Sequence, residues 1–380
     1  MFRNKLKVFK TTSFVLTVMF LLAAGTLFVS PVNAGYADCD NGYACWKAIG
    51  QQAATKAVKM MREEVKRVRF KDLIALSNAG YAEVNGETTM GALDGLSCVL
   101  GVNRGDTSLL EIHSAADKAL WFAIYHKRSG HCVYLQVDPE ALGSKFSRGR
   151  WNGQSVFSIT VMEQINAAHL FANEAIYAEK FNAGIFGGNE FRIVTIANAV
   201  AEGAPSYAVR SFEFHDHYCP GVTSGILMAQ YLKSYYPLDT GGSYFAQGVQ
   251  PSCKEDALQV MLNATPGKSG YSVTYPTSDD IASWPDWAKS ARNIIYVKES
   301  SSSPWVALVL GYQGGDTDCG DYTTTIINKL CSDLWYLENL DQPEAFVQVL
   351  KEIELPDGEA PKDYARPGVD PILKLDALMN

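Results

Sequence analysis

The sequence predicts an α+β fold of two similar domains, each with helices packed on a mostly antiparallel sheet. Segments with helical periodicity alternate with two β-hairpin patterns, and the strands of a hairpin run antiparallel. Short motifs also recur in the two halves of the chain. Asp94-Gly95-Leu96, followed by residues 104–107, has the same spacing as Asp256-Ala257-Leu258, followed by residues 266–269. Because a hairpin pattern follows each set, we interpret the halves as a diverged duplication.

The N-terminal segment has the pattern of a secretory signal. Basic residues precede an almost wholly apolar stretch at residues 14–29, and Val32-Asn33-Ala34 has the small residues of a cleavage site. We therefore expect residues 1–34 to be a signal peptide, cleaved near Ala34, and the protein to be secreted, periplasmic or on the cell surface. An uncleaved anchor is the alternative, because the apolar stretch is only slightly short for a membrane span. No later segment is expected to cross a membrane.

The charge balance argues against nucleic acid as a partner. The 380 residues include 41 acidic and 33 basic ones, a net charge of −8. Removal of the basic signal makes the mature chain more negative still. Such a protein is repelled by nucleic acid phosphates and by anionic lipid. The length is sufficient for two ordinary domains.

The elements expected in the first half are two helices, a hairpin and two connecting segments. They are a helix at residues 44–66, a helix at 91–100, a hairpin of 119–125 and 132–137, a helical segment at 162–181, and a strand or short helix at 192–200. Residues 35–150 are assigned to the first domain and residues 151–205 to a connecting helical segment.

The second half is expected to repeat this order. Its elements are an extended run at residues 212–218, a helix from Pro220 to about residue 235, a helix opened by Cys253, and a hairpin of residues 293–298 and 305–310. Proline suits the first turn of a helix. Residues 206–345 are assigned to the second domain. The proline-containing stretch at 352–367 is expected to be a surface tail or linker within a C-terminal tail of residues 346–380.

Eight cysteines follow the signal, and export makes disulfides permissible. Cys319 and Cys331 are close enough in sequence to staple a corner between a loop and a helix. Cys98 with Cys132 and Cys39 with Cys45 are further candidate pairs. No Cys-x-x-Cys pair is present, which argues against a zinc ribbon or a thioredoxin-like redox site.

The chemistry of the chain is centred on His215-Asp216-His217-Tyr218-Cys219-Pro220-Gly221. In an extended strand alternate residues face the same side, so the two histidines and Cys219 are expected to point together. Cys219 would lie at the N-terminus of the following helix, where the helix dipole favours a thiolate. Two imidazoles and a thiolate are good ligands for zinc and acceptable ones for copper, iron or nickel. Cys253, water or a substrate can occupy a fourth position.

Other interpretations of this segment stay open. A histidine is more often a hydrogen-bonded residue than a metal ligand, and an exported cysteine is usually bridged. Cys219 beside two histidines also has the features of a catalytic nucleophile. A disulfide between Cys219 and Cys253 is the third alternative, and it would leave both histidines unexplained.

The same residues carry a resemblance to a known family. Residues 214–221, with the helical run at 222–229, resemble the opening motif of the FmdE family, which takes its name from formylmethanofuran dehydrogenase. Residues 253–259, continuing to 265–270, are similar to its second motif, in which a cysteine precedes Asp-Ala. The resemblance covers residues 210–312 well and residues 42–140 only faintly.

The resemblance implies an α+β domain with a transition metal, usually zinc. The four matching donors are His215, His217, Cys219 and Cys253. It also implies that this domain forms dimers. Asp216 stands where the family usually has glycine, and Ser269 alters the Gly-Lys-Gly turn. The C-terminal zinc finger of some members is absent.

The first half lacks the corresponding donors. At constant spacing Gly91 takes the place of Cys253, and Ala53, Thr55 and Ala57 fall opposite the other three. We therefore interpret the first half as a degenerate second copy without a metal site. The chain would then contain a pseudo-dimer, and a homodimer of the whole chain is also open.

Two functions follow from these expectations. The first is an exported metal-binding protein that captures or transfers a metal ion or a metal-bearing ligand such as a tetrapyrrole. The alternative is a zinc-dependent enzyme with an open coordination position, for which Asp216 or Glu213 would be the nearby acid or base. In either case Asp216 and Lys268 are candidate contacts to a small-molecule ligand, although Lys268 can equally be a solvated turn residue.

Overall fold

The computed structural model describes residues 37–38, 42–147, 150–151, 155–320 and 322–379. All of them belong to one compact unit, Tyr36–Asn380. The expected signal peptide lies outside the described residues. Within the described part of the chain, no helix is long and apolar enough to span a membrane.

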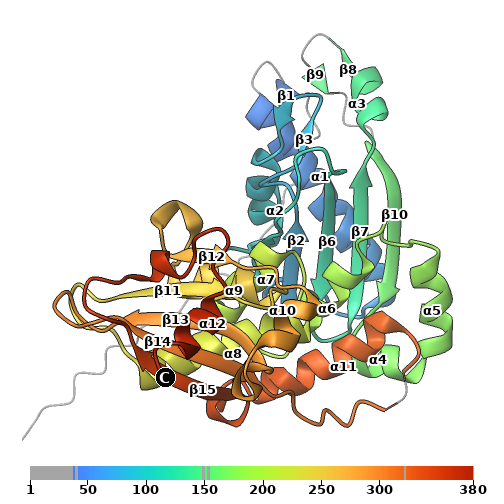
Figure 1. The fold of residues 1–380 in the computed structure, drawn as a ribbon. Helices are drawn as coiled ribbons and strands as arrows, with labels where there is room; N and C mark the ends of the chain where they lie inside the picture. The colour runs from blue at the N-terminus through green and yellow to red at the C-terminus, as the bar shows by residue number, and fades with distance from the viewer. Residues whose placement is uncertain (1–36, 39–41, 148–149, 152–154, 321, 380) are drawn as a thin grey trace, which may run out of the picture. The chain divides into compact units, whose positions relative to one another are not determined.

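The first sheet has five strands in the order β10-β7-β6-β2-β5 (Figure 1). Its strands are β2 (Leu73–Ser77), β5 (Leu109–Glu111), β6 (Trp121–His126), β7 (His131–Val137) and β10 (Phe157–Gln164). Only the β2–β5 pair is parallel. Helices α1 (Gly42–Glu64) and α2 (Gly91–Leu100) share a buried apolar cluster with one face of this sheet. Both predicted helices and the predicted hairpin are confirmed.

The second sheet also has five strands, in the order β12-β11-β13-β14-β15 (Figure 1). Its strands are β11 (Ser243–Gly248), β12 (Tyr271–Val273), β13 (Ala291–Lys298), β14 (Val306–Tyr312) and β15 (Val347–Glu354). Again only one pair, β11–β12, is parallel. Helices α8 (Pro220–Tyr235) and α9 (Lys254–Leu262) pack on one face through the apolar residues of the largest core cluster. The second hairpin and the α+β class are confirmed.

The two sheets repeat one topology, because each strand of the first has a counterpart of the same direction and order in the second. The helix pairs correspond as well. A Cβ atom on Gly50 of α1 would lie 2.1 Å from the carbonyl oxygen of Ala92 in α2, and one on Gly225 of α8 would lie 2.2 Å from that of Lys254 in α9. Only glycine permits backbones this close. The repeated topology and crossing support the prediction of two similar domains.

A layer of helices lies between the two sheets. Its apolar residues belong to the largest core cluster, together with residues from one face of each sheet. It contains α4 (Ala167–Ala172), α5 (Glu174–Asn182), α6 (Glu190–Ala201), α7 (Ser206–His215) and α11 (Thr325–Glu338). The helix expected at residues 162–181 is wrong at its start, because β10 extends to Gln164 and pairs with β7. Residues 192–200 are helical within α6, whose apolar residues are buried around most of its circumference. Such a helix shows no clear one-sided period in its sequence.

The expected tail at residues 346–380 is instead part of the second sheet and its cover. Strand β15 pairs with β14 along its whole length. Tyr364 is fully buried, and helix α12 (Pro371–Asp376) contributes Ile372 and Leu375 to the apolar cluster on this sheet face. The prolines of this segment lie at short turns and helix starts that cover the sheet. Their spacing in the sequence alone is also typical of a linker, which explains the wrong prediction.

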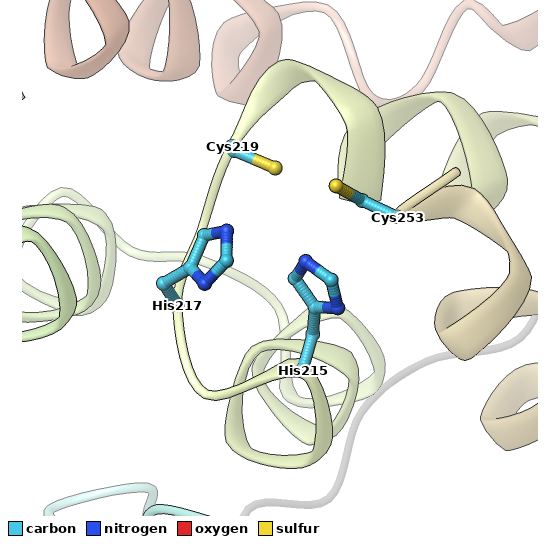
Figure 2. Close-up of side chains that lie close together, drawn as sticks. All are labelled: His215, His217, Cys219 and Cys253. Carbon is cyan, nitrogen blue, oxygen red and sulfur yellow. The ribbon is translucent and has the colours of Figure 1, made fainter. Parts of the chain in front are cut away.

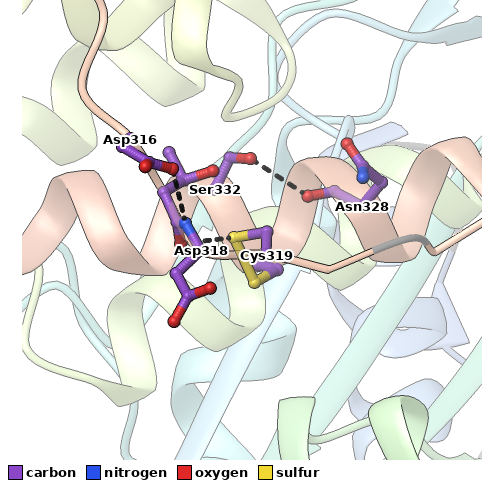
Figure 3. The surroundings of a disulfide bond; sticks show 7 residues. Asp316, Asp318, Cys319, Asn328 and Ser332 are labelled. Atoms are coloured by element: carbon purple, nitrogen blue, oxygen red, sulfur yellow. Dashed lines mark hydrogen bonds between the residues drawn. A yellow bond between two sulfur atoms is a disulfide. The ribbon is translucent and has the colours of Figure 1, made fainter.

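The predicted disulfide between Cys319 and Cys331 is present and ties a loop to α11 (Figure 3). The suggested Cys98–Cys132 pair is wrong, since both cysteines are free. Cys132 faces the helical layer, whereas Cys98 is on α2, which covers the opposite face of the sheet. Cys45 is disulfide-bonded, and its suggested partner Cys39 lies outside the described residues.

Replacement of Cys331 by serine is expected to lower the free energy of unfolding by about 3 kcal/mol. The disulfide closes a loop with a sequence separation of 12, and this value follows from the chain entropy that such a loop removes from the unfolded state. Urea unfolding of the wild type and the variant measures the difference. Replacement of the free, exposed Cys98 by serine is the control and should change stability by less than about 0.5 kcal/mol.

Asp333 of α11 is expected to make stability depend on pH. It is fully buried, neither carboxylate oxygen has a hydrogen-bond partner among the described residues, and burial raises its pKa well above the usual value. The folded protein therefore retains a proton that the unfolded chain releases. As pH rises above the ordinary aspartate pKa, this residue lowers the free energy of unfolding by up to about 1.4 kcal/mol per pH unit.

The variant Asp333→Asn cannot ionise, so it should gain stability over the wild type at pH 7 and gain little at pH 4. Urea unfolding at both pH values tests this, with the exposed Asp279→Asn as control. An equal effect of Asp333→Asn at the two pH values would contradict the prediction.

Candidate metal centre

The backbone at the centre of the motif is a helix, a turn and a second helix. Helix α7 ends at His215, and Asp216 has a left-handed backbone with φ of 69°. Cys219 is extended and precedes α8, whose first residue is Pro220 as predicted. The extended run expected at residues 212–218 is therefore wrong. Phe212 is buried with Ala208 and Val209 at helical spacing, and this packing overrides the β preference of the local aromatic residues.

The structure brings His215, His217, Cys219 and Cys253 together (Figure 2). One potential ligand atom from each residue lies within 4.8 Å of the other three. The turn at Asp216 reverses the chain, so His217 and Cys219 return towards His215. Cys253 precedes α9 and comes from the crossing helix. A Cβ atom on Gly221 would lie 2.9 Å from the Cβ of Cys253, so glycine leaves room for the two thiols to meet.

Each histidine is oriented by a carboxylate. The Nδ1 of His215 donates to Oδ2 of Asp256 at 2.6 Å, and the Nδ1 of His217 donates to Oδ1 of Asp216 at 2.7 Å. The Nε2 of His215 is buried and has no hydrogen-bond partner among the described residues. Carboxylates that hold the distal nitrogen of a histidine are typical of metal sites. The partnerless Nε2 is thus available as a ligand atom.

Negative charge on the two thiols of the cluster is concentrated on Cys253. The neighbouring side chains of Cys219, His215 and His217 hold the pKa of the Cys253 thiol far below its usual value. The pKa of Cys219 is raised by the neighbouring Cys253 and by burial. Burial alone would lower the pKa of His215, but the hydrogen bond to Asp256 and the neighbouring Cys253 raise it to about 9. A thiolate held in this way is a strong ligand for a transition metal.

The donor set fits a tetrahedral metal ion. Two imidazole nitrogens and two sulfurs are a common set for zinc. Cys219 and Cys253 are both free thiols. The disulfide considered as an alternative is therefore not formed in the structure. Without a ligand, the partnerless buried Nε2 of His215 is unfavourable. The residues therefore suit the metal that the sequence implies.

The other two candidate site residues are placed differently. Both carboxylate oxygens of Asp216 are engaged, one by His217 and the other by Arg192 at 2.7 Å. These contacts hold the pKa of Asp216 below its usual value, although burial alone would raise it. Lys268 is exposed and bonds to Asn263 instead of approaching the donors.

Sequence reasoning missed Asp256 and Arg192 as partners of the two histidines. Asp256 follows Cys253 by one helical turn, and this spacing was a usable signal, since residues three apart share a helix face. Arg192 had no such signal. It comes from α6 and reaches Asp216 only through the tertiary fold.

The described residues also form a cavity of about 590 Å³ beside the start of α8. Its lining includes Gly221, Ser224, Ser252, Lys254 and Arg292. None of the four clustered donors lines it.

The repeated helix crossing shows what replaces the donors in the first half. Because Gly50 corresponds to Gly225 and Ala92 to Lys254, Ala44 occupies the position of Cys219 and Gly91 that of Cys253. The prediction for Gly91 agrees with this register. The placement of Ala57 opposite Cys219 is wrong, because connections of different length shift the first helix, and Ala57 is buried in the middle of α1.

The variant Asp256→Asn is expected to weaken zinc binding about 10- to 100-fold, because it removes the charge that orients His215. Competition with a chromophoric chelator measures the affinity. Asp279→Asn, an exposed substitution on α10 (Ser278–Ser283), is the control and should bind like the wild type. Equal affinity of the wild type and Asp256→Asn would show that Asp256 does not support a ligand.

Comparison with known proteins agrees with this geometry. Residues 214–301 match the family FmdE, described as molybdenum formylmethanofuran dehydrogenase operon. The matched region includes all four clustered donors and both helices of the close crossing. No curated protein matches the chain. The part of the chain from residue 214 to residue 301 is therefore a domain of the FmdE family.

Proposed function

We propose that this protein is an exported metal-binding protein that holds a transition metal at His215, His217, Cys219 and Cys253. Its role is the capture or transfer of the metal ion or of a metal-bearing ligand. The observation that carries the proposal is the convergence of four donor atoms within 4.8 Å, each histidine having a carboxylate on its other nitrogen. Zinc is the proposed metal, because it favours a tetrahedral set of two imidazoles and two thiolates.

The number of protein donors favours holding a metal over catalysis. Catalytic zinc sites keep one position open for water or substrate, whereas structural and storage sites use four protein ligands. Here four side chains supply ligand atoms, and none of them lines the neighbouring cavity. Asp216 and Glu213, the acids considered for an enzyme, are both engaged in ion pairs.

The first half is proposed to be a degenerate FmdE-like copy. It shares the strand order and the helix crossing of the second half. Ala44 and Gly91 occupy the positions that correspond to Cys219 and Cys253. The chain then contains its own pseudo-dimer, with one metal per chain. Export remains a proposal based on residues 1–34, and the Cys319–Cys331 disulfide is compatible with it.

Protein purified without added metal is expected to contain about one transition metal ion per chain, by elemental analysis. Replacement of both His217 and Cys219 by alanine should abolish stoichiometric metal, because two of four ligands are lost. Replacement of His169 and Cys98 by alanine, which removes the same residue types outside the cluster, is the matched control. Metal-free wild-type protein that cannot be loaded with zinc would refute the proposal.

A thiol count separates the metal site from a disulfide. In denatured, metal-free protein, the wild type should have two more reactive thiols than a variant with serine at both Cys219 and Cys253. No difference between the two proteins would mean that these cysteines are bridged.

A further inference from the structure

Glu213, two residues before the first histidine of the cluster, is a buried carboxylate with only 5% of its surface exposed. A buried charge is strongly unfavourable unless other groups compensate it. Its Oε1 accepts from the backbone N–H of Glu111 at 2.8 Å and lies 3.2 Å from Nη1 of Arg104. Its Oε2 accepts from Arg104 at 3.3 Å and from Arg210 at 2.5 Å. Glu111 and Arg104 belong to the first half of the chain, so this residue links the two halves.

The backbone and the next side chain reinforce this link. The N–H of His113 donates to the carbonyl oxygen of Glu213 at 2.9 Å. Carbonyls in the last turn of a helix lack hydrogen-bond donors within the helix. Here the first half of the chain supplies the donor for the carbonyl of Glu213. The ring of His113 stacks on Phe214 at 5.4 Å and meets the edge of Tyr81 at 4.7 Å. The last turn of α7 is therefore docked on the edge of the first sheet, at β5.

The four donors thus have two different supports. Cys219 and Cys253 lie at the starts of α8 and α9, whose close crossing at Gly225 fixes them within the second half. His215 is the last residue of α7, and the turn of α7 before it is held by the first half. A metal ligand must be positioned to within about 0.5 Å to bind well. The first half can therefore control the histidine side of the site without containing a donor.

We infer that the first half acts as a scaffold for the metal centre and that Arg104 and Glu213 are positioning residues for His215. This inference depends on the proposed function, because it assumes that the cluster binds metal. Neither residue lies in the region that matches the FmdE family, residues 214–301. The Arg104–Glu213 contact is thus a feature of this two-domain chain beyond the matched domain.

The test is a double-mutant cycle in the full-length mature protein, with zinc affinity measured by chelator competition. The variant Arg104→Ala should weaken zinc binding about tenfold, at the low end of the effect of groups that orient metal ligands. In a His215→Ala background the same substitution should have almost no further effect, since the ligand that it positions is gone. In a Cys253→Ala background it should keep its tenfold effect. A general loss of stability would act equally in both backgrounds.

Two further variants keep the test decisive. Arg128→Ala removes an exposed arginine that pairs with Asp72 elsewhere in the first half, and it should bind zinc like the wild type. Arg104→Lys keeps the charge and loses the two-pronged contact, so it should weaken binding less than Arg104→Ala and replaces it if the alanine variant does not fold.

The outcomes separate this inference from the proposed function. Wild-type protein that binds no zinc overturns both. Wild-type protein that binds zinc, with Arg104 variants of unchanged affinity or with equal effects in the two backgrounds, overturns only the positioning role of the first half.

Discussion

The close crossing of α8 and α9 is the constraint on which the candidate metal centre depends. Gly225 allows the backbone of α8 to contact the carbonyl oxygen of Lys254 directly, and a side chain here would push the helices apart. Cys219 precedes α8 and Cys253 precedes α9, so the crossing also sets how closely the two thiols approach. Gly221, one turn earlier, leaves the space that the sulfur atoms occupy. The first half preserves the same crossing at Gly50 without the cysteines.

The two halves therefore have different roles on one topology. The second half supplies two thiols on a rigid helix pair, and α7 with its turn adds two imidazoles, each oriented by a carboxylate. The first half lacks these donors but contacts the last turn of α7 through Arg104 and the backbone of Glu111 and His113. In the function that we propose, the second half binds the metal and the first half supports one of its ligands.

If the thiol pair lacked a metal, the export that we propose would place it in an oxidising compartment. Cys319 and Cys331 form a disulfide in the same domain, whereas Cys219 and Cys253 are free although they lie side by side. A bound metal would keep both sulfurs reduced by coordinating them as thiolates. Loss of the metal would then be expected to leave a pair prone to bridging, which connects the proposed occupancy of the site to its redox state.

The resemblance to the FmdE family identified Cys253 as the fourth donor. Local sequence patterns alone were enough to predict the α+β class, both hairpins, the four helices that pack on the outer faces or crossings of the two halves, and the other three clustered donors. These features follow from local periodicity, from Pro220 at a helix start, and from the short spacing of the motif. The folded structure was needed to establish that residues 212–215 are helical and that β15 joins a sheet, because burial against distant segments outweighs local preference there. Asp256 and Arg192 orient the histidines, and Arg104 supports Glu213. All three contacts join elements far apart in sequence. Only Asp256 had a local signal, its spacing of one helical turn from Cys253, and no local pattern encodes the other two pairs.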